Sequence, residues 1–107
     1  MAWIYLFIAG LMEIGWPLGL KLSQIQSAQK IWWILFAVLS MAASGFFLWL
    51  AQKVIPMGTA YAIWTGIGAA GAFVLGILLF HDSASFFRIV SASLIILGII
   101  GLKLSGQ

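Results

Sequence analysis

The stretch Ala2–Leu20 reads AWIYLFIAGLMEIGWPLGL and carries one charged side chain, that of Glu13. At about 1.5 Å per residue, a helix of this length crosses a hydrocarbon core of about 30 Å and places Glu13 near its middle. An ionised carboxylate is costly to bury there unless it is protonated, paired with a cation or facing a wet cavity. The stretch therefore predicts a membrane-spanning helix with a functional acid at its midplane.

The rest of the chain is as apolar as this stretch. Its 107 residues are 64% hydrophobic and 7% charged, with a mean hydropathy of +1.20, values typical of integral membrane proteins. Polar residues divide it into four apolar segments, each close to the roughly 20 residues that a spanning helix needs. We expect an all-α membrane protein: one four-helix transmembrane domain over residues 1–107, with helices at about 2–20, 31–51, 58–80 and 85–102.

The basic residues lie at the ends of these segments. The membrane face from which the first helix starts receives Lys53 and Lys103, and the opposite face receives Lys21, Lys30 and Arg88. Because Lys/Arg asymmetry sets topology, so small a bias predicts that copies insert in both orientations. Four helices enclose a solute path poorly, so we expect an antiparallel, dual-topology homodimer. One fixed orientation is the alternative. Bases scattered in this way suit lipid headgroups rather than nucleic acid.

Aromatic and hydroxyl side chains recur at helical spacing around the acid. Trp16 follows Glu13 by three residues, and Tyr61 and Trp64 have the same spacing, so each pair shares a helix face. A carboxylate among aromatic rings suits an organic cation, because ring faces attract a desolvated positive charge. Tyr61 and Ser44 can donate hydrogen bonds to the carboxylate. The alternative is that each ring only fills space between helices.

Pro17 lies four residues after the acid. It has no N–H to bond the Glu13 carbonyl, so that oxygen is free for a cation or water, or the helix kinks there. A proton and a cationic substrate then compete for the one carboxylate. We expect this competition to make an exchanger, in which inward proton flow drives export of the cation, and we expect binding to weaken as pH falls.

The stretch GTAYAIWTGIG at residues 58–68, together with the acid in the first of four short helices, resembles the small multidrug resistance family of bacterial inner-membrane exporters. Members of that family exchange protons for cations as antiparallel homodimers. Trp16, Thr59, the TGIG at residues 65–68 and the ending at residues 98–103 are more similar to its guanidinium-exporter branch. The chain departs from that branch at Pro17 and in the first loop, residues 23–29, which bears on the range of substrates.

The resemblance implies a role for each matching residue. Glu13 would bind both the proton and the substrate, and the fourth helix would mediate dimerisation. The other residues implied are the lining residues Trp16, Ser44, Tyr61 and Trp64, and the kink in the third helix at Gly66 and Gly68.

Other functions remain open at this point. They are a broader exporter of quaternary ammonium ions, one subunit of a heteromeric pair, a small cation channel, and a regulatory membrane peptide. We expect no enzyme, cofactor or metal site, because the chain has no cysteine and its one histidine, His81, lies in a predicted loop away from any nucleophile.

Overall fold

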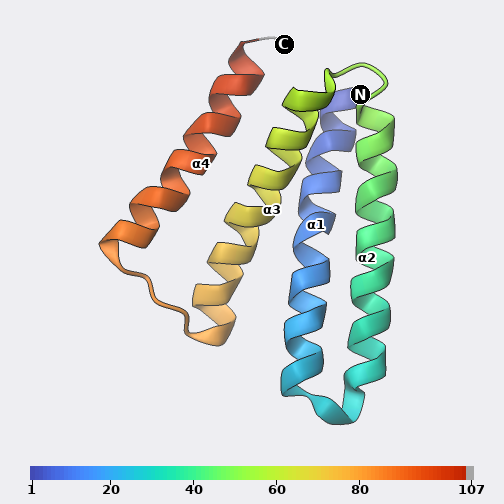
Figure 1. The fold of residues 1–107 in the computed structure, drawn as a ribbon, viewed down its shortest axis with the longest axis vertical. Coiled ribbons are helices and arrows are strands. Elements are labelled where there is room, and N and C mark those ends of the chain that lie inside the picture. The colour runs from blue at the N-terminus through green and yellow to red at the C-terminus, as the bar shows by residue number, and fades with distance from the viewer. Residues whose placement is uncertain (106–107) are drawn as a thin grey trace.

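The computed structural model describes residues 1–105, which form four long helices and one short 3₁₀ turn (Figure 1). All four helices are long and apolar enough to cross a membrane, as the sequence predicted. Their bounds are Ala2–Ile25 for α1, Ser27–Gln29 for the turn η1, Lys30–Ala51 for α2, Met57–Phe80 for α3 and Phe86–Leu104 for α4.

The first helix is longer than the sequence predicted. It was expected to end at Leu20, with residues 21–30 as a loop, but α1 continues through Lys21 to Ile25. A lysine ends an apolar run but does not end a helix. Helices typically end at Gly, Pro or a capping residue. Ser23 bonds to the helix itself, its hydroxyl donating to the Leu20 carbonyl at 2.6 Å. The first connection is thus one short turn rather than an extended loop.

The start of α4 is tied to α3. The Ser85 side chain caps the helix by accepting from the Arg88 N–H, and the Arg88 side chain donates to the Ser83 carbonyl at 2.7 Å. The Arg88 guanidinium also lies 4.9 Å from the centre of the Phe73 ring in α3. The helix therefore begins at Phe86, one residue later than predicted, and extends to Leu104. Residues 106–107 of the expected domain lie outside the described residues.

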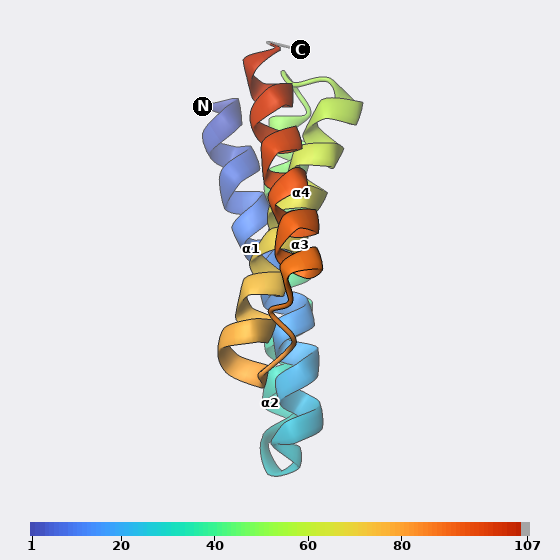
Figure 2. The same cartoon turned by 90° about the vertical axis from the view of Figure 1, so that its left-hand side faces the viewer.

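The four helices form a flat layer. In Figure 1, α2, α1, α3 and α4 follow one another across the molecule, and Figure 2 shows the same layer edge-on. The extents of 46 × 34 × 16 Å match a layer about one helix thick. Because the chain runs up and down, α1 and α3 end at the same edge. The N-terminus, the α2–α3 link and the end of α4 lie at the opposite edge.

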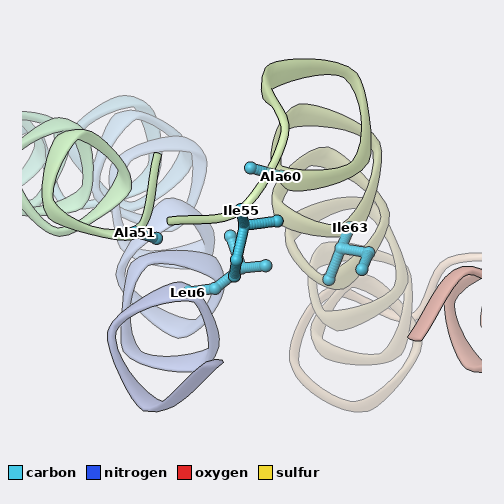
Figure 3. Close-up of a cluster of buried hydrophobic side chains, with 5 residues drawn as sticks. All are labelled: Leu6, Ala51, Ile55, Ala60 and Ile63. Carbon is cyan, nitrogen blue, oxygen red and sulfur yellow. The ribbon is translucent and has the colours of Figure 1, made fainter. Parts of the chain in front are cut away.

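A small hydrophobic cluster joins the helices at the edge that holds the N-terminus. Figure 3 shows the five side chains, which come from α1, the end of α2, the α2–α3 link and α3. They are Leu6, Ala51, Ile55, Ala60 and Ile63. In contrast, α4 contributes no buried residue: Ile99 and Leu102 pack partly against the cluster, and most of its other apolar side chains are exposed in the single chain.

Close helix contacts hold the layer together elsewhere. A Cβ atom on Gly19 of α1 would lie 2.8 Å from the Trp33 carbonyl oxygen of α2, and one on Gly10 would lie 2.7 Å from Ile67 Cβ of α3. Small residues let membrane helices approach closely. Van der Waals contacts between the helices then take the place of contacts between helix and lipid. We call these two lines of contact, α1 with α2 and α1 with α3, the seams of the layer. They hold α1 between α2 and α3 and so set the position of Glu13.

Candidate cation-binding site around Glu13

Glu13 lies on α1, where α2 and α3 approach it from either side. From α2, the hydroxyl of Ser44 is 3.3 Å from Glu13 Oε1, and Ser44 is fully buried. From α3, the backbone at Gly68 lies against the Glu13 stem: a Cβ on Gly68 would fall 2.6 Å from Glu13 Cγ. The carboxylate is thus held between two helices, one offering a hydroxyl and the other bare backbone.

Ser44 links all three helices. Trp64 of α3 donates its indole N–H to Ser44 Oγ at 2.7 Å, and Ser44 Oγ lies 2.7 Å from the carbonyl oxygen of Ala9 in α1. A serine hydroxyl carries one hydrogen, so it can donate either to Ala9 or to Glu13, but not fully to both. The shorter distance to Ala9 indicates that the hydrogen points mainly to the carbonyl in this arrangement.

This geometry makes the Ser44 hydroxyl responsive to the charge of its neighbour. When Glu13 carries a proton, its carboxyl can donate to Ser44 while Ser44 donates to Ala9. When Glu13 is ionised, the Ser44 hydrogen can turn to the carboxylate, and such a charge-assisted bond is shorter and stronger. Trp64 can donate to Ser44 in both cases. The hydroxyl can therefore accommodate both protonation states with little movement of the helices.

Glu13 lines a cavity between α1 and α3. The cavity has a volume of about 220 Å³ and is open to the outside of the single chain. A buried acid needs a proton, a paired cation or a cavity that admits water, and the structure provides a cavity. Its walls combine the acid with aromatic, hydroxyl and small side chains: Glu13, Trp16, Pro17, Thr65, Gly68, Ala69 and Ala72.

The structure brings most of the predicted site residues together. Ser44 and Trp64 form one hydrogen-bonded chain with Glu13, and Trp16 shares the cavity wall with the acid. Tyr61 lies further out. Its ring packs on Trp64, with centroids 5.3 Å apart, and 56% of the residue is exposed. Tyr61 and Trp64 thus present a tilted aromatic pair from one helix face, as their spacing predicted.

The two predicted kink glycines of α3 have different neighbours. Gly68 faces Glu13, whereas a Cβ on Gly66 would meet the end of the Ile99 side chain of α4 at 2.8 Å. The helix is continuous through both residues. The contact between Gly68 and Glu13 could not be read from the sequence, because it depends on the rotation of α3 against α1.

A second cavity lies beside the first, toward the edge where α1 and α3 end. It has a volume of about 240 Å³, and Pro17 and Ala72 line both cavities. At its outer end are Lys21 of α1 and Asp82 of the α3–α4 link. Asp82 is the chain's second acid, and its place in a short polar link gave no sign that it lies beside a cavity. The two cavities are thus neighbours along α1 and α3.

No resident metal centre is visible in this part of the molecule. Among the described residues, no three or more His, Cys, Asp or Glu side chains gather where a metal ion could sit. The buried side-chain polar atoms of residues 1–105 all have hydrogen-bond partners. The polar chemistry of the site therefore rests on the carboxyl, hydroxyl and indole groups described above.

These observations define a class: a small multi-pass membrane protein with one acid held at the junction of three spanning helices. Comparison with known proteins then gives the family. Residues 1–95 match the model of the Small Multidrug Resistance protein family, and the chain belongs to that family. It is thus a multi-pass transport protein of the bacterial inner membrane, in agreement with the resemblance seen in the sequence.

Similar proteins extend over the whole chain. A guanidinium exporter of Yersinia pseudotuberculosis is 52% identical over 105 residues, covering 98% of this chain and 99% of the relative. A guanidinium exporter of Salmonella typhimurium is 50% identical over 107 residues, the full length of both. A guanidinium exporter of Escherichia coli K12 is 49% identical over 105 residues, 98% of each. All three relatives are named as exporters.

Proposed function

We propose that this protein is a proton-coupled antiporter that exports guanidinium or small guanidinylated cations, with Glu13 as the shared site of proton and substrate. The observation that carries the proposal is the placement of Glu13, whose carboxyl lies 3.3 Å from the Ser44 hydroxyl and which lines a cavity between α1 and α3. The names of the full-length relatives support guanidinium as the substrate.

The chemistry of guanidinium suits this site. The ion is planar, and its N–H groups can pair with a carboxylate in a two-pronged geometry. Trp16 in the cavity wall and Trp64 beside Ser44 place aromatic rings near the acid, and such rings can compensate a cation for lost water. A cavity of about 220 Å³ exceeds what so small an ion fills, so water or a substituent can accompany it. Substituted guanidines are therefore proposed as further substrates.

Coupling follows from the use of one acid for two ligands. An ionised Glu13 attracts the cation, whereas a protonated Glu13 has no charge to offer, so each ligand must leave before the other binds. If the site changes its exposure only when occupied, protons moving inward drive the cation outward. Binding of guanidinium then weakens as pH falls, because protons occupy the carboxylate.

We further propose that the working unit is an antiparallel homodimer. In the single chain, α4 buries none of its residues, and Cβ atoms on Gly98 or Gly101 would meet no atom within 4 Å. A second copy packed on α4 would cover this apolar surface. The near-balance of Lys and Arg between the two faces favours opposite orientations.

Transport by the purified protein in proteoliposomes tests this function. We expect guanidinium to produce a current in electrophysiological recordings on supported membranes, and tetrapropylammonium, a quaternary ion without N–H donors, to produce little. Currents of similar size for both ions would assign the protein to the broader multidrug activity instead. Sustained conductance in planar bilayers without a proton gradient would indicate a channel. Absence of any transport would indicate a regulatory membrane peptide or one subunit of a heteromeric pair.

A further inference from the structure

Gly68 of α3 lies directly against the side chain of Glu13. A Cβ atom on Gly68 would be 2.6 Å from Glu13 Cγ and 3.2 Å from Glu13 Cβ. Carbon atoms pack favourably at about 3.5–4.0 Å, so no side chain larger than hydrogen fits here without displacing the acid. The space that holds the Glu13 stem exists because residue 68 has no side chain.

The Gly68 contact and the Ser44 hydroxyl flank the Glu13 side chain from different helices. Ser44 lies at 3.3 Å from the Glu13 carboxylate on the side of α2, while Gly68 limits the stem on the side of α3. At 3.3 Å, the Ser44–Glu13 hydrogen bond is already longer than the usual O–H···O range of about 2.5–3.0 Å. A shift of the stem by about 1 Å, the amount needed to relieve a 2.6 Å contact, changes that bond substantially.

We propose that Gly68 is a positioning residue for Glu13: its missing side chain lets the acid lean on the α3 backbone and fixes where the carboxylate meets Ser44 and the cavity. This role differs from that of a flexible glycine in α3, which would act through the helix backbone. The transport consequence rests on the function proposed above, but the contact itself can be tested independently of transport.

The first test is a double-mutant cycle on the unfolding of the purified protein in detergent. Gly68→Ala should lower stability in the wild-type background, because the new methyl group meets Glu13 Cγ. The Glu13→Ala change removes Cγ and leaves only the 3.2 Å contact with Cβ. In that background, the effect of Gly68→Ala should be much smaller. Equal effects in both backgrounds would overturn the proposal.

A matched cycle separates positioning from helix flexibility. Gly66→Ala removes a glycine from the same part of α3, but its new methyl group would meet Ile99 rather than the acid. We therefore expect no coupling between Gly66→Ala and Glu13→Ala. Coupling as strong as that of Gly68 would contradict the proposal. If Gly68→Ala alone does not fold, recovery of folding in the Gly68→Ala/Glu13→Ala double variant supports it, and failure of that variant to fold overturns it.

The second test observes the carboxyl group itself. Glu13 is the only glutamate in the chain, so ¹³C-glutamate labelling gives one protein side-chain carboxyl signal by NMR. Gly68→Ala should shift this signal, because the new methyl group moves the Glu13 stem away from α3 and so changes the distance from its carboxyl to Ser44. Gly45→Ala is the control, because a Cβ there would meet nothing within 4 Å.

The outcomes of the second test separate the positioning role from the transport function. A Glu13 signal unchanged by Gly68→Ala would contradict the positioning role. If the wild type binds no guanidinium, the proposed function fails, while the cycle and the NMR signal still decide the role of Gly68.

Discussion

At the scale of single residues, the site depends on how few polar groups surround the acid. Ser44 carries one hydroxyl hydrogen, which Ala9 and Glu13 share, and it receives the indole hydrogen of Trp64. Loss of the hydroxyl would leave the Trp64 N–H without its partner and Glu13 without its donor. A buried group left unpaired in this way costs about 1–3 kcal/mol.

The Ser44→Ala change tests this network. We expect guanidinium affinity to fall by about tenfold, because the ionised carboxylate loses a charge-assisted hydrogen bond. Titration calorimetry of the purified protein measures this effect. The matched control is Ser93→Ala on α4, whose hydroxyl bonds only to the Ile89 carbonyl of its own helix. Affinities equal to wild type in both variants would show that Ser44 does not orient the acid.

The polar residues of the site could be predicted from the sequence, but its backbone contacts, at Gly68 and at the Ala9 carbonyl, could not. An acid in an apolar helix is conspicuous, and the spacing of Tyr61 and Trp64 placed both rings on one face. The side of Glu13 that meets Gly68, and the choice of Ala9 as a partner of Ser44, depend on how three helices are rotated against one another. No local pattern encodes those rotations.

At the scale of elements, the seam between α1 and α3 determines the shape of the site. Gly10 and Gly71 let the two helices meet, because Cβ atoms there would collide with Ile67 and Ile14 respectively. Both cavities lie along this seam. The helix ends were harder to predict: Lys21 marked the end of the apolar run, yet α1 continues to Ile25 because nothing there breaks a helix.

A methyl group in this seam should destabilise the fold. Gly71→Ala would press on the Ile14 side chain, and overpacking of this kind costs about 1–3 kcal/mol. Thermal unfolding in detergent should therefore show a lower midpoint than in wild type. The same change at Gly45, where the space is open, should leave the midpoint unchanged or slightly raised, because alanine favours the helix. Equal midpoints for the two variants would mean that α1 and α3 can move apart without loss of stability.

At the scale of the whole molecule, the flat layer leaves one helix largely uncovered. Four helices in a layer 16 Å thick leave α4 and one side of the site open, so a second copy is proposed to complete the enclosure. The charge count suggested opposite orientations, but the position of a partner cannot be derived from one chain. The small number of helices and the balance of charges predicted the dimer, and the family resemblance agrees with that prediction.

Labelling of single cysteines tests the two orientations. The chain has no cysteine of its own, so Ser27→Cys in η1 and Val54→Cys in the α2–α3 link report the two membrane faces separately. In intact cells, an impermeant maleimide should label a similar fraction of each variant, because each face is outside in half of the copies. Labelling of one variant alone would establish a fixed orientation and exclude the antiparallel dimer.

The most direct test of the shared carboxylate is proton movement driven by guanidinium. Proteoliposomes loaded with a pH-sensitive dye are given an outward guanidinium gradient, with wild-type protein and with Glu13→Gln. We predict that the interior of wild-type vesicles acidifies as guanidinium leaves, whereas the Glu13→Gln variant, which keeps the side-chain length but cannot ionise, moves no protons. Coupled acidification in the variant would place the proton site elsewhere and contradict the mechanism.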